Sequence, residues 1–325
     1  RCLPKTAWPP TLWLEQFPDR LLCSKEELVG YMVSRLNLTS EDVVIIDRTT
    51  GVGQAIMQNA GPARIGIIIH ADHFSESNCN DDYILWNNYY EYAFSQNKHV
   101  DFYVTATDAQ NQLLKEQFEK YLHVSPRIVT IPVGSLDELK YPAQPRRPYS
   151  LITASRLAGE KHVNWVVAAA AQAHEQLPQL TLDIYGKGTE EENLKDQIKR
   201  LGCTDYIHLM GQQNLTEVYQ DYEAYIAGST SEGFGLTLLE AVGGGLPIIG
   251  FDVRYGNQNF IDEGQNGYKI ALDEHMDDKS KIALLAEKIV KLFTQADMEA
   301  FHEHSYEKAK GYLTEEVVDK WKNLI

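Results

Sequence analysis

Two glutamates flank a glycine-rich loop in STSEGFGLTLLEAVGGGLPIIG, residues 229–250. Glycine in SEGFG lets the backbone approach a ligand closely, and LTLLEAV then opens a helix whose first N–H groups lack intrahelical partners. Such a helix start suits a diphosphate. Glu232 lies in the loop and Glu240 about one turn into the helix. The pattern favours a site in which both glutamates bind one elongated ligand. The alternative is a purely structural role, with Glu240 solvated on the helix and Glu232 interacting with the helix dipole.

Two cations in SRLAGEKH, residues 155–162, directly follow another strand-like run. Arg156 and Lys161 would lie at the carboxyl edge of the same sheet as the Gly-Phe-Gly loop. An Arg fork and a Lys point charge suit a diphosphate leaving group, and the alternative is a pair of ordinary surface cations. A weaker third element is the Gly186 turn in YGKGTEE, where the backbone could meet a nucleotide.

Histidines and further glycines offer two other chemistries, and neither is well supported. His70 and His73 in IIIHADHF are three apart, but no third and fourth ligand follows with metal-site spacing, and no Asp-x-Asp triplet occurs. Gly51 and Gly53 in DRTTGVGQAI lack the third glycine and the acidic partner of a nicotinamide site. We therefore expect metal-independent chemistry in which the cations and the helix start stabilise a departing phosphate.

Alternating strands and helices must position these residues. Short apolar runs predict buried parallel strands, first at 43–47, 64–69, 101–106 and 127–132, then at 150–155, 181–186, 206–211, 223–229 and 246–251. Helices are expected near 53–60, 82–94 and 108–121, and the tail from 280 to 325 reads as two or three amphipathic helices. The proline-rich YPAQPRRPYS interrupts the alternation.

These elements predict an α/β protein with two Rossmann-like parallel-sheet domains that face a cleft. The expected parts are an irregular segment 1–22, an amino-terminal Rossmann-like domain 23–140, a linker 141–149, a carboxy-terminal Rossmann-like domain 150–310 and a terminal helix 311–325.

Composition narrows the class of partner. The formal charge of −16 and the pI near 5.1 disfavour nucleic acid and anionic lipid, so a peripheral membrane contact is not supported by charge. The four cysteines have neither disulfide-framework nor metal spacing, and neither a signal peptide nor an 18-residue apolar run occurs. We expect a cytoplasmic protein, with the inner face of the cell membrane as the alternative location.

The motif set resembles the retaining glycosyltransferases of family 4, which have the two-Rossmann GT-B fold and a Glu-x7-Glu motif. Glu232 and Glu240 match that motif, and Arg156 and Lys161 match the family's pyrophosphate-binding pair. The resemblance implies that Glu232 approaches the donor sugar, that Glu240 holds the ribose hydroxyls and that no cofactor is needed, since the UDP-sugar is a substrate. It also implies that 23–140 is the acceptor-side domain and that 150–310 is the nucleotide-sugar-binding domain. Four residues would meet sugar and phosphates through their backbone: Phe234, Gly235, Leu236 and Thr237.

A narrower resemblance covers nearly everything from residue 18 onward. FPDRLLCSKEELVGYMVSRLNLTSEDVVIIDRTTG, HADHFSE, DDYILWNNYYEYAFS and FDVRYGNQNFIDEGQNGY are similar to the catalytic subunits of the accessory-secretion-system O-GlcNAc transferases. That family moves N-acetylglucosamine from UDP-GlcNAc to Ser or Thr of serine-rich repeat adhesins, and it works with a homologous non-catalytic subunit. The resemblance also implies that His70 lies at the donor sugar, with Asp72 and His73 as second-layer or acceptor-side candidates.

One departure from that family concerns the start of the chain. Family members begin earlier, with a first strand, a glycine-rich loop and an inserted β-rich domain, so we expect an incomplete amino-terminal sheet here. Three alternatives stay open: another UDP-sugar transferase of this fold, such as a wall-polymer glucosyltransferase; a truncated, non-catalytic subunit of the glycosylation complex; and an NAD-dependent oxidoreductase.

Overall fold

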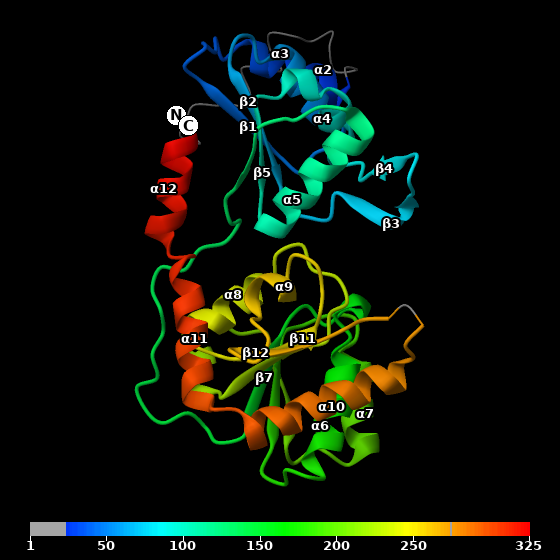
Figure 1. The fold of residues 1–325 in the computed structure, drawn as a ribbon, viewed down its shortest axis with the longest axis vertical. Coiled ribbons are helices and arrows are strands. Elements are labelled where there is room, and N and C mark those ends of the chain that lie inside the picture. Colours follow the sequence, from blue (N-terminus) through cyan, green and yellow to red (C-terminus); the bar gives the residue numbers. More distant parts are fainter. Residues whose placement is uncertain (1–23, 274) are drawn as a thin grey trace, which may run out of the picture. The chain divides into compact units, whose positions relative to one another are not determined.

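The computed structural model describes residues 24–273 and 275–325, so the segment expected to be irregular, 1–22, lies outside the described residues. The chain forms two compact units (Figure 1). The smaller unit runs to Ile69 and resumes at His73–Tyr103, and the larger one comprises His70–Asp72 and Val104–Ile325.

A four-stranded sheet of order β1-β2-β5-β6 organises the amino-terminal part of the fold. Its strands are β1 (Val43–Asp47), β2 (Arg64–Ile69), β5 (Phe102–Thr105) and β6 (Ile128–Thr130), and β1 pairs with β2 in parallel. The four predicted strands are confirmed. The helices of this part are α2 (Lys25–Ser34), α3 (Gly51–Asn59), α4 (Glu91–Ser95) and α5 (Asp108–Gln117), which runs into a single π-helical turn, η4 (Phe118–Leu122).

The expected helix at 82–94 is wrong over most of its length. β3 (Phe74–Cys79) and β4 (Ile84–Trp86) pair there as an antiparallel hairpin, and only α4 is helical. The Asn80 side chain closes the turn by accepting hydrogen bonds from the backbone N–H groups of Asp82, at 2.8 Å, and Tyr83, at 3.0 Å. Such local side-chain bonding by Asn competes with helix formation, and the apolar spacing alone did not reveal it.

A six-stranded sheet of order β12-β11-β10-β7-β8-β9 organises the larger unit, and every neighbouring pair is parallel. Five of its strands were predicted: β7 (Ser150–Ala154), β8 (Thr181–Tyr185), β9 (Ile207–Gly211), β10 (Ala224–Ala227) and β11 (Ile248–Phe251). The sixth, β12 (Gly267–Ile270), was not expected. The order reverses between β7 and β10, which is where open α/β sheets bind ligands.

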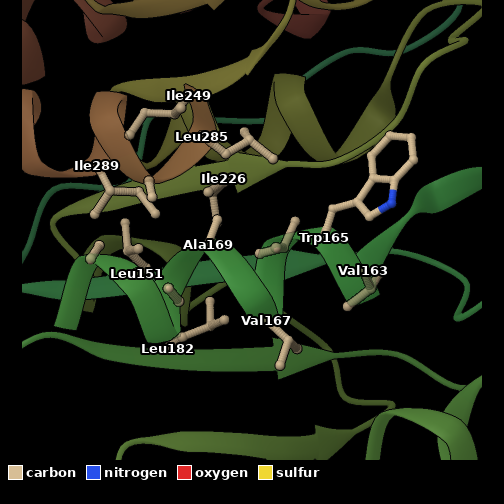
Figure 2. Close-up of a cluster of buried hydrophobic side chains, with 14 of the residues drawn as sticks. Leu151, Val163, Trp165, Val167, Ala169, Leu182, Ile226, Ile249, Leu285 and Ile289 are labelled. Atoms are coloured by element: carbon tan, nitrogen blue, oxygen red, sulfur yellow. The ribbon is translucent and has the colours of Figure 1, made fainter. Parts of the chain in front are cut away.

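Helices cover both faces of this sheet because successive strand residues point to opposite sides. On one face, α6 (Val163–His174), α7 (Glu191–Leu201) and α10 (Asp278–Gln295) enclose one buried cluster, in which Leu151, Ile226 and Ile289 meet Ala169 (Figure 2). On the other face lie α8 (Leu236–Gly243), α9 (Asn257–Phe260) and α11 (Met298–Lys310).

The tail, expected to hold two or three helices, forms three and ends in α12 (Thr314–Leu324). Within the part of the chain that the structure describes, every helix is too short or too polar to cross a bilayer.

Candidate functional site

The site is built where the sheet order reverses. β7 and β10 are parallel neighbours, so the loops that follow them leave the same edge of the sheet. The first loop leads through a 3₁₀ turn, η5 (Gly159–Lys161), into α6 on one face, and the second leads into α8 on the other face. The carboxyl ends of β7 and β10 therefore bring together two loops that are distant in sequence.

An ion pair joins these two loops. Lys161 Nζ lies 2.6 Å from Glu232 Oε1, and each side chain is only 18% exposed. Gly228 makes the approach feasible, since a Cβ there would lie 2.6 Å from the His162 carbonyl oxygen. Gly256, in the segment between β11 and α9, lets a third part of the chain approach Glu232, because a Cβ there would lie 2.4 Å from Glu232 Cβ. The fold thus fixes a cation and a carboxylate side by side.

The start of α8 presents backbone donors. Its N-cap is Gly235, whose φ of +88° is a left-handed conformation, and no side chain caps the helix. The first N–H groups are therefore open to an anion. Phe234 is buried and packs edge-on against Phe260, with 5.2 Å between ring centroids, whereas Leu236 is exposed. Because the side chain of Phe234 is buried, this residue can contact a ligand only through its backbone.

Thr237 is tied to the strands beneath it. Its Oγ1 lies 3.1 Å from the hydroxyl of Tyr225, and that hydroxyl donates to the Ala154 carbonyl at 2.8 Å. Burial raises the pKa of Tyr225 to about 12, so the phenol keeps its proton as a donor. The first turn of α8 is thereby anchored to the ends of β7 and β10.

Glu240 lies on α8 and is held from the side. Its Oε2 accepts a hydrogen bond of 2.9 Å from the hydroxyl of Tyr219, in the 3₁₀ turn η6 (Tyr219–Asp221). The surrounding protein raises the pKa of the Glu240 carboxyl through desolvation, and the hydrogen bond from Tyr219 acts in the opposite direction. Sequence reasoning missed Tyr219, since the contact arises from packing of η6 on α8 and leaves no spacing signal.

The other predicted residues are placed differently. Arg156 shares the loop of Lys161, but its guanidinium pairs with Glu160 at 2.8 Å and its side chain is 76% exposed. Gly186 ends β8 with a φ of +135°, and a Cβ there would lie 1.9 Å from the Ser155 carbonyl oxygen. Its observed contact is therefore with the loop after β7. His70 directly follows β2 and opens the segment His70–Asp72, which groups with the larger unit.

Among residues 24–273 and 275–325, no group of three or more His, Cys, Asp or Glu side chains could hold a metal ion. The described geometry offers instead a Lys–Glu pair, an uncapped helix start and a second glutamate, which together can bind a ligand that carries both phosphate and hydroxyl groups.

Comparison with known proteins finds glycosyltransferases that are similar to this chain. The chain is 54% identical to the UDP-N-acetylglucosamine–peptide N-acetylglucosaminyltransferase GtfA subunit of Streptococcus gordonii over 96% of its own length and 62% of the relative. It is also similar to the pneumococcal O-GlcNAc transferase GtfA solved with UDP and GlcNAc, with a TM-score of 0.88, 49% identity and coverage of 93% of this chain and 60% of that one.

A third similarity is to a solved GtfA/B complex, with a TM-score of 0.90, 54% identity and coverage of 94% of this chain and 61% of that one. The chain therefore spans about three fifths of the length of each of these three relatives. The two parallel sheets and these structural similarities confirm the expected GT-B fold class.

The family model described as glycosyl transferases group 1 matches residues 137–303. That range contains Lys161, Glu232 and Glu240 together with all six strands of the larger sheet. The chain belongs to the group 1 glycosyltransferases.

Proposed function

We propose that this chain carries the donor site of a retaining, metal-independent transferase that moves N-acetylglucosamine from UDP-GlcNAc to Ser or Thr of a polypeptide, specifically a serine-rich repeat adhesin. Similarity to the GtfA subunit, at 54% identity, supports the donor and the peptide acceptor. The identity of the acceptor as a serine-rich repeat adhesin is inferred from the sequence resemblance alone. The observation that carries the proposal is the Lys161–Glu232 pair at the point where the sheet order reverses.

In this proposal the UDP-sugar lies along the loop and α8. The diphosphate meets the uncapped start of α8, with Lys161 and Arg156 as its cations, and the backbone from Phe234 to Thr237 contacts sugar and phosphates. Gly186 offers its backbone to the nucleotide. Glu240 accepts hydrogen bonds from ribose hydroxyls, and His70 meets the donor sugar. The donor is a substrate, so no resident cofactor is required.

Retention of configuration follows from attack and departure on one face of the sugar. The bond between C1 and the β-phosphate oxygen breaks, and the bond between C1 and the acceptor hydroxyl oxygen forms on the same side. The acceptor proton passes to the departing phosphate. Glu232 offsets the positive charge that develops at the sugar, and Arg156, Lys161 and the helix start stabilise the negative charge on UDP.

Its partners are UDP-GlcNAc, the acceptor polypeptide and a homologous non-catalytic subunit. A solved GtfA/B complex of a 54% identical relative supports the subunit. We place the reaction in the cytoplasm, on the cysteine usage and acidic charge described above.

The test measures transfer to a Ser/Thr-rich peptide, with and without the partner subunit, from UDP-GlcNAc and from UDP-glucose. Glu232→Gln and Arg156→Ala should each abolish transfer and leave the far-UV circular dichroism spectrum unchanged. Glu307→Gln, at an exposed glutamate paired with Lys310 on α11, is the matched control and should keep full activity. Full activity in either site variant would overturn the assignment of that residue, and preference for UDP-glucose would favour the wall-polymer alternative.

A further inference from the structure

The buried phenol of Tyr219 contacts the carboxylate of Glu240, an exposed residue on α8, at one end of the proposed donor site. The Tyr219 hydroxyl donates to Glu240 Oε2 at 2.9 Å, and Tyr219 is 2% exposed. Burial first, and then the neighbouring Tyr225 and Glu240, raise the pKa of Tyr219 well above its ordinary value, so the hydroxyl remains a donor. An ionised carboxylate can only accept hydrogen bonds. The bond from Tyr219 therefore uses Oε2 of Glu240 and leaves Oε1 for another donor.

The second oxygen of Glu240 has no hydrogen-bond partner among the described residues. Glu240 itself stays exposed on α8, whereas Glu232 has its Oε1 paired with Lys161. An exposed glutamate side chain samples several rotamers, and a single hydrogen bond from a rigid, buried phenol restricts that freedom. Tyr219 thus selects a carboxylate position in which one oxygen remains available to a ligand.

The backbone around Tyr219 is itself fixed. A Cβ on Gly244 would lie 2.8 Å from Tyr219 Cβ, so the glycine lets η6 pack directly on the end of α8. The Arg146 guanidinium then donates to the carbonyls of Gln220, at 2.8 Å, Tyr222, at 2.9 Å, and Gly244, at 2.8 Å. One arginine therefore joins the two elements that carry the phenol and the carboxylate.

We propose that Tyr219 is a positioning residue for recognition of the nucleotide's ribose: its hydroxyl holds Glu240 so that the free carboxylate oxygen accepts from the ribose 2′- and 3′-hydroxyls. This inference rests on the proposed function, in which Glu240 meets the ribose. Tyr219 acts through Glu240 and does not contact the reacting atoms in this proposal. The predicted effect is therefore on donor affinity and on discrimination between riboses, with kcat less affected than KM.

The experiment compares binding of UDP and of 2′,3′-dideoxyuridine diphosphate by calorimetry. Wild-type protein should prefer UDP. Tyr219→Phe should weaken UDP binding about tenfold and leave binding of the dideoxy analogue nearly unchanged, so that the preference is lost. The matched control is Tyr222→Phe, which also removes a buried phenol's hydrogen bond to a carboxylate, here the 2.5 Å contact with Asp183, and should keep the wild-type preference.

Each result decides between the proposals. Absence of UDP binding by the wild-type protein contradicts the proposed function, whereas UDP binding without preference for the intact ribose contradicts only the role of Tyr219. If Tyr219→Phe prefers UDP over the dideoxy analogue as strongly as the wild-type protein does, the positioning role of Tyr219 is also contradicted. If Tyr219→Phe does not fold, Gly244→Ala displaces Tyr219 without removing its hydroxyl and should lower the same preference, and an unchanged preference there counts against the inference.

Discussion

Lys161 Nζ and Glu232 Oε1 lie 2.6 Å apart, although 71 residues separate them along the chain. Each follows a strand, and β7 and β10 are parallel neighbours, so the sheet places both at one edge. At 18% exposure each charge has lost much of its hydration and depends on the other for stabilisation. The pair is thus both a structural contact and, as proposed above, part of the donor site.

Separating this pair should be costly and non-additive. Lys161→Met and Glu232→Gln should each lower the free energy of unfolding by about 1–3 kcal/mol, because each leaves a poorly hydrated partner unpaired. The double variant should lose less than the sum of the two, with a coupling of about 1 kcal/mol, in urea denaturation. Lys310→Met, at an exposed pair with Glu307, should cost about 0–1 kcal/mol. Additive losses at Lys161 and Glu232 would show that the contact contributes nothing.

Gly186 should tolerate no side chain. A Cβ would lie 1.9 Å from the Ser155 carbonyl oxygen, and the φ of +135° suits only glycine. Gly186→Ala should therefore lower stability by about 2–4 kcal/mol, seen as a lower thermal midpoint. Gly159→Ala is the control, since nothing lies within 4 Å of its Cβ, and it should change stability by less than about 1 kcal/mol. Equal midpoints for the two variants would contradict the close approach of β8 to the loop after β7.

His302 should make stability depend on pH. Burial, and then the charge of Arg146, lowers the pKa of this histidine from 6.5 to about 4, and its Nε2 lies 3.1 Å from the Glu223 carbonyl oxygen. Between those pH values the unfolded chain binds more protons than the folded one. The free energy of unfolding should therefore fall as pH drops from about 6.5 to about 4, by on the order of 3 kcal/mol in total.

The check is urea denaturation at several pH values in that window. His302→Asn should flatten the dependence because the titrating group is gone, whereas His99→Asn, at an exposed position, should keep the wild-type slope. An unchanged slope in His302→Asn would assign the pH dependence to other groups.

The sequence determined most of the architecture. Short apolar and β-branched runs are typical of strands in a parallel sheet, so nine strands were predictable without coordinates, although β1 and β9 are only partly buried. Glu232, Glu240, Arg156 and Lys161 were identifiable as chemistry-bearing residues because they follow strands, where parallel sheets present their loops. Local hydrogen bonding was harder to foresee, and the Asn80 turn converted an expected helix into the β3–β4 hairpin.

Only the tertiary structure decided which of these residues meet. Lys161, and not Arg156, pairs with Glu232 in the loop after β10, whereas Arg156 is 76% exposed and pairs with Glu160. Tyr219 reaches Glu240 because Gly244 and Arg146 bring η6 onto α8. Periodicity in a sequence fixes which face of an element is buried, but contacts between side chains far apart in the chain depend on strand order and on the close approach of backbones.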